Sequence, residues 1–327
     1  MTVVPGIDAD FDQRLQDNLT LVEERLQEVV GHDDEFIAGA SHHLLDAGGK
    51  RFRPLLTLLV SELGTGCNVE VIDAAAGVEL THLASLYHDD VMDEATVRRG
   101  VTAANLAYDN STAILIGDLL FGRASQLVAG LGAQAVRIQA DTFVRLCAGQ
   151  IEDDRQAPEG QDPMDYYLRV LAGKTGSLIA TAARYGGMFA GVPAPTIELV
   201  ARYGELLGMV FQLSDDLLDV ASNEQESGKP AGADLREGVT TLPVLYVRAS
   251  TDPCDDRLKD LLSHPLVDED EFDEALALLR AHPAMQQAQA HTMAVAQEAV
   301  ALLDGLPDGD AVDALRALPI SVAARTA

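Results

Sequence analysis

The chain has 327 residues, of which 47% are hydrophobic and only 5% aromatic, a composition typical of packed helices in a globular protein. Its formal net charge of −29 excludes a nucleic-acid partner, because binding to phosphate backbones requires clustered lysine and arginine. The three cysteines are widely spaced and form no metal-binding or redox pair, so we expect reduced thiols and a cytoplasmic protein.

The first predicted element is an amphipathic helix that begins at Phe11. Leu15, Leu19, Val22 and Leu26 recur at spacings of three and four, which places them on one helical face. Further helix-length segments follow, separated by breaks at residues 48–49, 64–66, 130–132, 158–163, 191–195, 222–232 and 305–309. We find no strand–helix alternation, no repeat and no apolar run that approaches membrane-spanning length. The expectation is one all-helical domain over residues 1–327, with no stable membrane insertion.

A basic segment precedes the third of these predicted helices. Gly48 to Pro54 places two glycines and then Lys50, Arg51 and Arg53 before an apolar run, in a chain with only four lysines. Backbone and guanidinium donors in such a segment suit a phosphate group. The alternative is a helix start with solvated charges, which the scarcity of lysine disfavours.

The predicted helix from Val71 to Glu94 is apolar through most of its length and ends in the first aspartate cluster, Asp89, Asp90 and Asp93. Asp89 and Asp93 share a helical face, and His82 lies two turns earlier on that face. We expect His82 to donate to a second anion, with a buried core histidine as the equally weighted alternative. We expect the adjacent His88 to have a packing role.

The predicted helix from Ile197 to Val220 ends in the same pattern, the second aspartate cluster of Asp215, Asp216 and Asp219. Carboxylates on one helical face suit magnesium, which takes a few carboxylates together with water and phosphate oxygens. Two such helix ends that face one another would hold a diphosphate through bridging ions. One cluster alone would be explained by a solvated surface, but two at the ends of apolar helices favour a metal site.

Together these motifs resemble the polyprenyl synthetase family, also called trans-prenyl diphosphate synthases, over about Gly48 to Pro243. The matching blocks, in the order of the family, are Gly48–Pro54, His82–Asp93, Arg98–Gly100, Gly117–Asp118, Lys174–Thr175, Phe211–Asp219 and Gly228–Pro243. The resemblance implies a homodimeric bundle of helices around a deep central cavity. It also implies a magnesium-dependent enzyme that condenses isopentenyl diphosphate with an allylic diphosphate, head to tail.

The resemblance further implies a role for each matching residue. About three magnesium ions per active site would be held by Asp89, Asp90, Asp93, Asp215 and Asp219, with Asp216 as a ligand or its close support. Isopentenyl diphosphate would be held by Lys50, Arg53, His82 and Arg99. The allylic diphosphate would be held by Arg98, Lys174, Thr175, Gln212 and Lys229. Lys174 and Asp216 join the aspartates as catalytic residues. One departure is Val239, which stands where many members have a second lysine.

Product length should depend on the helix that ends in the first aspartate cluster. Ser85, Ala84 and Thr81 lie four, five and eight residues before Asp89. A helix rises about 5.4 Å per turn, close to one isoprene unit, so small residues there let a growing tail descend. Family members that stop at farnesyl or geranylgeranyl length usually carry an aromatic residue at the fourth or fifth position. We therefore expect roughly eight to ten isoprene units.

The floor of that channel would come from the neighbouring helix around Phe121, Leu127 and Val128. A geranylgeranyl product is the alternative. An alternative of another class is a non-catalytic partner subunit of a heteromeric synthase, which the presence of both aspartate clusters disfavours. A terpene cyclase would not need a second diphosphate site such as Lys50 and Arg53 provide.

Overall fold

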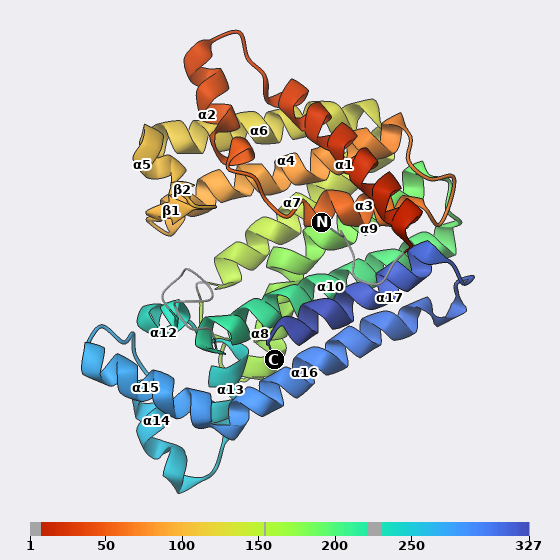
Figure 1. Cartoon of the computed structure of the whole chain (residues 1–327). Coiled ribbons are helices and arrows are strands. Elements are labelled where there is room, and N and C mark those ends of the chain that lie inside the picture. Colours follow the sequence, from red (N-terminus) through yellow and green to blue (C-terminus); the bar gives the residue numbers. More distant parts are fainter. Residues whose placement is uncertain (1–7, 154, 222–230, 327) are drawn as a thin grey trace. The chain divides into compact units, whose positions relative to one another are not determined.

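The computed structural model describes residues 8–153, 155–221 and 231–326 (Figure 1). Regular structure in these ranges is helical except for a hairpin of two short strands, β1 (Val97–Arg98) and β2 (Val101–Thr102). The all-helical prediction is confirmed. Most of the predicted break at residues 222–232 lies outside the described residues. The predicted site residue Lys229 also lies outside them.

The chain divides into two compact units that are interleaved in sequence. The first unit comprises Met1–Val144, Leu178–Gly204 and Leu306–Leu315, and the second comprises Arg145–Ser177, Glu205–Gly305 and Arg316–Ala327. Helices α7 (Ala133–Asp153), α10 (Ala194–Ala221) and α17 (Asp310–Ala323) therefore contribute residues to both units. That the chain acts as a single domain stays a prediction.

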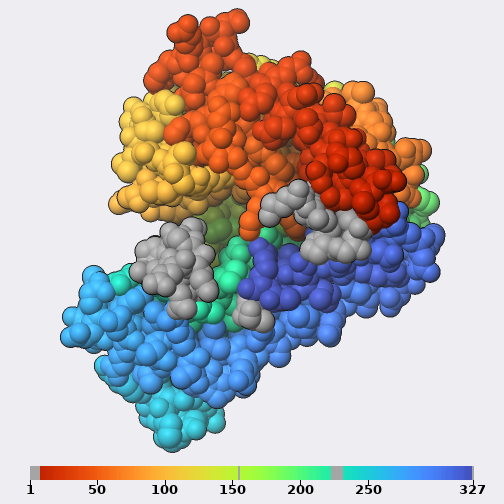
Figure 2. Space-filling model, in the orientation of Figure 1, coloured from red at the N-terminus to blue at the C-terminus, as the bar shows by residue number. Residues whose placement is uncertain are grey.

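The first unit is built around α4 (Val69–Met92), which contacts α1, α2, α3, α5 and α6 and is buried on most sides. The cap residues Asp8, Asp34 and Asn68 start α1, α2 and α4 by accepting hydrogen bonds from backbone N–H groups. Figure 2 shows α1 and α2 on the surface of this unit. Its other helices are α1 (Ala9–Val30), α2 (Glu35–Asp46), α3 (Phe52–Ser61), α5 (Ala104–Tyr108), α6 (Asn110–Gly130) and, from Leu178 onward, α9 (Ser177–Phe189).

By length and composition, helix α6 is apolar enough to cross a membrane. The expectation that no segment approaches membrane-spanning length is therefore wrong for α6. The helix packs along α4 and buries Ile116, Leu120 and Val128. Only 39% of its most apolar stretch is buried, and Ile114 and Leu115 are 43% and 65% exposed.

The second unit has a core made mainly by its C-terminal helices, where Leu235, Val247, Leu261, Phe272 and Leu279 are buried together. Three helices start at aspartate or proline residues that suit a first turn, namely α8, α13 and α15. Its elements are α8 (Pro163–Leu171), the π-helix η1 (Ala172–Gly176), α12 (Ala233–Glu237), α13 (Leu242–Ala249), η2 (Pro253–Asp255), α14 (Asp256–Leu261), α15 (Glu269–Ala281), α16 (Pro283–Ala301), η3 (Leu302–Gly305) and η4 (Ala324–Thr326).

Candidate functional site

The Arg98–Gly100 motif forms the only hairpin among the described residues. Arg98 pairs with Val101, which leaves Arg99 and Gly100 as a two-residue turn with φ values of 53° and 80°. Positive φ at both central positions is the pattern of a tight hairpin turn. The sequence analysis missed this hairpin, because strands of two residues have no detectable alternation. Its two neighbouring arginines contact different partners, Arg98 the carboxylates of Asp90 and Asp93 and Arg99 the carbonyl of Leu44.

Arg53, His82 and Arg99, three of the four residues predicted to hold isopentenyl diphosphate, come together in the first unit. Burial, and then the charges of Arg53 and Arg99, lower the pKa of His82 well below its usual value, so the imidazole is neutral. The Nε atom of Arg53 is buried without an acceptor among the described residues. The fourth residue, Lys50, is exposed. A concentration of guanidinium groups around a neutral histidine suits an anionic ligand.

The first aspartate cluster divides into one buried and two more accessible carboxylates. Asp90 is fully buried and accepts hydrogen bonds from Arg98 Nε at 2.6 Å and from the backbone N–H of Ala104 at 2.7 Å. Asp93 is exposed, and its Oδ2 lies 3.3 Å from Arg98 Nη2, whereas Asp89 is half-buried. The end of α4 is thus tied to the hairpin and to α5 through Asp90.

Two other residues near this cluster contact neighbouring helices. His88 Nε2 lies 3.3 Å from Asp118 Oδ1 and its ring packs against Phe121. The hydroxyl of Tyr87 donates to the carbonyl of Ala40 on α2 at 2.5 Å.

The predicted chain-length residues lie on α4 with different degrees of burial. Thr81 and Ala84 are 1% and 0% exposed, whereas Ser85 is half-buried. The Thr81 hydroxyl accepts from Gln139 Nε2 of α7 at 2.6 Å. Val128, one of the predicted floor residues, packs close to Gly77, one turn further from the aspartates than Thr81.

In the second unit, Lys174 lies on the π-helix η1, where its Nζ donates to Asp153 Oδ2 at 2.6 Å. Gly149 of α7 permits this arrangement, because a Cβ at that position would lie 2.4 Å from the backbone nitrogen of Lys174. A π-helical turn inside an α-helix often marks a functional site. Lys174 is therefore held by close backbone contact as well as by charge.

Asp216 is the buried member of the second aspartate cluster, 5% exposed. It accepts hydrogen bonds from the hydroxyl of Tyr167 and from Gln212 Nε2, the latter at 3.2 Å. The hydroxyl of Thr175 reaches the other side of Gln212 at 3.4 Å. Burial raises the pKa of Asp216 to about 6, although these donors act in the opposite direction. The structure thus brings Thr175, Gln212 and Asp216 together.

Asp219 ends the cluster by accepting from the backbone N–H groups of Ala233 and Asp234 at 3.1 and 3.2 Å, at the start of α12. Burial, and then repulsion from Asp219 and Asp216, raises the pKa of Asp234 to about 7. Asp234, Asp153 and Tyr167 were not predicted. Asp153 belongs to the pair Asp153-Asp154, which lacks the third aspartate of the cluster pattern. Tyr167 lies in none of the matching blocks, and Asp234 lies in the block Gly228–Pro243 without a role assigned to it.

Among the described residues, no group of three or more His, Cys, Asp or Glu side chains is arranged to hold a metal ion. Magnesium does not require such a group, because it binds one or two carboxylates and takes its remaining ligands from water and phosphate. Burial first, and then repulsion from neighbouring carboxylates, raises the pKa of Asp216 and Asp234, and a cation beside them would offset both effects. The carboxylates present therefore fit a magnesium ion that arrives with a phosphorylated ligand.

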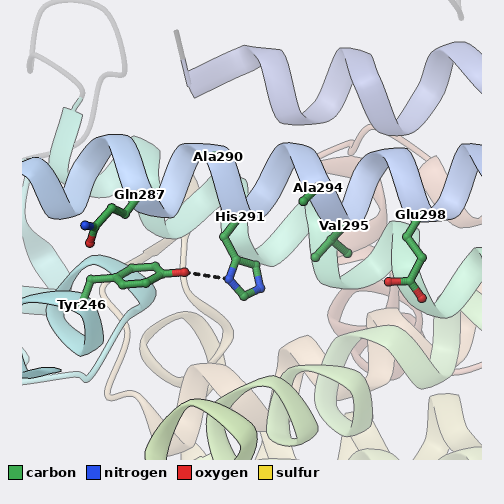
Figure 3. Close-up of a pocket in the computed structure, with 7 residues that line it drawn as sticks. All are labelled: Tyr246, Gln287, Ala290, His291, Ala294, Val295 and Glu298. Carbon is green, nitrogen blue, oxygen red and sulfur yellow. Dashed lines mark hydrogen bonds between the residues drawn. The ribbon is translucent and has the colours of Figure 1, made fainter.

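A groove of about 520 Å³ elsewhere on the second unit contains none of the predicted site residues (Figure 3). It lies along α16, where the Tyr246 hydroxyl and His291 Nδ1 are 2.9 Å apart. Burial lowers the pKa of His291, so the groove has no cation that would bind a diphosphate. The other residues that line it are Gln287, Ala290, Ala294, Val295 and Glu298.

Residues 34–279 match the family described as Polyprenyl synthetase. The chain is 45% identical to a nonaprenyl diphosphate synthase of Mycobacterium tuberculosis, over 96% of each protein. It also resembles two solved structures. One is a geranylgeranyl pyrophosphate synthase from Corynebacterium glutamicum complexed with calcium and isoprenyl diphosphate, at 41% identity, 98% coverage of each chain and a TM-score of 0.88. The other is a decaprenyl diphosphate synthase from Rhodobacter capsulatus, at 32% identity, 96% and 98% coverage and a TM-score of 0.88. The chain belongs to the polyprenyl synthetase family of prenyltransferases.

Proposed function

We propose that this prenyltransferase lengthens an allylic diphosphate by repeated head-to-tail addition of isopentenyl diphosphate, with a long-chain polyprenyl diphosphate as product. The observation that carries the proposal is the cluster of Arg53, Arg99 and neutral His82 beside the first aspartate cluster. Arg53 and Arg99 act on one another unfavourably at this site, and an anion bound beside both would relieve that repulsion.

The two diphosphates would bind two different sets of residues, as the resemblance implies. Isopentenyl diphosphate would bind Lys50, Arg53, His82 and Arg99. The allylic diphosphate would bind Arg98, Lys174, Thr175, Gln212 and Lys229. Arg98 and Lys174 are now paired with Asp93 and Asp153, and both pairs are partly exposed, so substrate phosphates can compete for the cations.

Magnesium would be held by Asp89 and Asp93 of the first cluster and by Asp215 and Asp219 of the second. When bound, the metal supplies positive charge to the leaving diphosphate. The calcium in the Corynebacterium glutamicum relative supports the use of a divalent cation. Asp90 and Asp216, whose oxygens accept from protein donors, would support these ligands.

The chemistry needs no protein nucleophile. The allylic C–O bond breaks to give a carbocation and diphosphate, which Lys174 and Arg98 stabilise by charge. The double bond of isopentenyl diphosphate then supplies the electrons of the new C–C bond. The proton lost from the resulting cation goes to the released diphosphate. Apolar walls would exclude water, which would otherwise quench the cation.

A long product is supported by the small residues Ala84 and Ser85 on α4 and by the nonaprenyl and decaprenyl synthases among the relatives. A geranylgeranyl product is the second candidate. The Corynebacterium glutamicum relative favours it, and so does the contact of Val128 with Gly77, which limits the depth available beside α4.

We further propose that the enzyme is a cytoplasmic homodimer. Helices α6 and α7 pack together through Phe121 and Phe143, whose ring centroids are 4.4 Å apart. Large apolar side chains are exposed on both helices, and a patch of this kind on a soluble protein usually marks an interface. We call this set the α6–α7 apolar patch: Ile114, Leu115, Val136 and Val144, which are 43%, 65%, 43% and 67% exposed. The three free cysteines are consistent with a reducing compartment.

The test is an incubation of purified protein with magnesium, radiolabelled isopentenyl diphosphate and farnesyl diphosphate. We expect labelled prenyl diphosphates of roughly eight to ten units after chromatography. A product of four units would establish the second candidate. Absence of any elongated product from folded protein would contradict the proposed function and would favour a non-catalytic partner subunit.

A further inference from the structure

Two arginines near the proposed isopentenyl diphosphate site have an uncommon backbone conformation. Arg51 has φ of 46° and Arg99 has φ of 53°, and such values are found at only four non-glycine positions among the described residues. Residues with a Cβ rarely adopt this conformation, because the Cβ approaches the carbonyl oxygen. It persists only where the surroundings hold the residue in place.

The guanidinium groups of these two arginines meet over the same glycine. A Cβ at Gly49 would lie 3.0 Å from Arg99 Cζ and 3.1 Å from Arg51 Nη1. Two positive groups at such short range repel one another unless a negative group lies beside both. The arrangement therefore requires a counter-ion that is shared between them.

Glu79 of α4 is that counter-ion. Its Oε1 lies 3.3 Å from Arg51 Nη1 and 4.0 Å from Arg99 Nη2, and the residue is only 2% exposed. Its Oε2 is buried and has no donor among the described residues. A buried carboxylate that is only half satisfied is unfavourable for the isolated fold, so its retention calls for a further reason.

Each arginine also donates to another residue that the other arginine does not contact. Glu79 is therefore the carboxylate that links the two. Arg51 donates to both oxygens of Glu23 at 2.7 and 3.0 Å. Arg99 donates to the carbonyl of Leu44 at 2.9 Å. Glu79 lies three residues before His82 on α4, so the link is anchored on the same helix as the proposed diphosphate ligand.

We propose that Glu79 is a positioning residue that holds Arg99 beside Arg51 and so aims Arg99 at the diphosphate of isopentenyl diphosphate. The inference rests on the proposed function. It assigns Glu79 no contact with the substrate. Its effect should therefore appear in the binding of isopentenyl diphosphate and not in the binding of the allylic diphosphate.

A purely electrostatic role predicts the opposite sign. A negative charge buried beside an anion site weakens anion binding, so its neutralisation would lower the Michaelis constant for isopentenyl diphosphate. A positioning role predicts an increase. In Glu79→Gln the amide keeps the volume of the side chain and its carbonyl oxygen takes the place of Oε1, but the negative charge that the two arginines share is lost, so the two arginines separate.

The experiment measures kcat, both Michaelis constants and the melting temperature for wild type, Glu79→Gln and Glu79→Asp. For Glu79→Gln we expect about a tenfold increase in the constant for isopentenyl diphosphate and less than about a twofold change for the allylic substrate. Glu79→Asp restores the charge and should recover part of the loss. The matched control is Asp73→Asn on the same helix, which removes a carboxylate bound to Arg25 at 2.7 Å and should change neither constant.

An unchanged or lower constant for isopentenyl diphosphate in folded Glu79→Gln would overturn the inference. So would equal effects on both substrates together with a lower melting temperature, which would mark a structural role. If Glu79→Gln does not fold, Glu79→Asp decides by the same criterion, with a smaller increase expected. A wild-type protein without any turnover of isopentenyl diphosphate would contradict the proposed function itself, a result distinct from these.

Discussion

Asp90 and Asp216 occupy the same place in the two aspartate clusters, and both are buried under protein donors. Their neighbours Asp89 and Asp215 are half-buried. The sequence predicted that all six aspartates of the two clusters bind or support magnesium, because the spacing of residues shows which of them share a helical face. It does not show which oxygens already accept from an arginine or a tyrosine, since Tyr167 is 49 residues away from Asp216.

At the scale of single residues, we expect Asp89→Ala and Asp215→Ala to lower kcat by at least about 10² to 10³ while the protein stays folded. Each substitution removes a proposed metal ligand and therefore charge from the leaving diphosphate. Steady-state kinetics at saturating magnesium, with circular dichroism of each variant, provide the measurement. Unchanged turnover in both variants would contradict the assignment of the clusters.

A second prediction concerns Asp234, whose pKa is raised to about 7. A carboxyl group with a raised pKa stabilises the fold while it is protonated, and this contribution is lost as the pH rises from about 4 through about 7. Without divalent ions, wild type should therefore melt at a higher temperature at pH 5.5 than at pH 8. Asp234→Asn should raise the melting temperature at pH 8 by about 2–4 °C and reduce the difference.

The comparison is made in chelator by differential scanning fluorimetry, and wild type is its control. Exposed carboxyl groups with a lowered pKa, such as those of Glu198 and Glu274, make the protein more stable as the pH rises. They do so equally in wild type and in Asp234→Asn, so they do not alter the comparison. A pH dependence of the same size in both proteins would show that Asp234 is not the group responsible.

At the scale of helices and strands, several boundaries followed from the sequence, whereas the break between α1 and α2, that between α4 and α6 and those between α12 and α16 were not predicted. The predicted helices Val71–Glu94 and Ile197–Val220 correspond to α4 and α10, which begin and end within three residues of those positions. The predicted breaks were marked by glycine and proline. The β1–β2 hairpin and the π-helix η1 were not predicted, because each depends on distant partners: Asp90 for Arg98, and Gly149 for Lys174.

The prediction at this scale concerns the channel beside α4. Ser85→Phe should shorten the product by several isoprene units, because an aromatic ring one turn below Asp89 fills the path of the tail. Ala84→Phe should shorten it too, but with a lower melting temperature, because Ala84 is fully buried. Chromatography of the products gives the measurement, with Thr20→Phe on the exposed side of α1 as control. A length distribution unaltered by either ring would refute this channel.

At the scale of the whole molecule, the fold class followed from composition and periodicity, whereas the exposure of α6 did not. The sequence pattern of an apolar helix is the same whether the helix contacts a protein core, a membrane or a second copy of the chain. The structure resolves part of this ambiguity, since α6 buries only one side against its own unit.

We therefore expect Leu115→Glu and Val144→Glu to convert a dimer into single chains. A charge in the centre of an apolar interface is costly to desolvate, and about a hundredfold weaker association is the expected scale. Sedimentation velocity at several concentrations provides the measurement. Val267→Glu is a matched control, because Val267 is 83% exposed but lies in the second unit, outside the α6–α7 apolar patch. Dimers that persist in both patch variants would place the interface elsewhere.

The interleaving of the two units has a consequence for how the gene can be divided. Since each unit is assembled from three separate stretches, no single cut in the chain separates the two units, because a fragment that contains one complete unit also contains parts of the other. A fragment that ends at Val144 would lack Tyr185, whose hydroxyl bonds to Ala135, and Ala182, whose carbonyl accepts from Thr57. Truncation or recombination at such a point should produce an insoluble chain, whereas two halves synthesised together could still assemble into one enzyme.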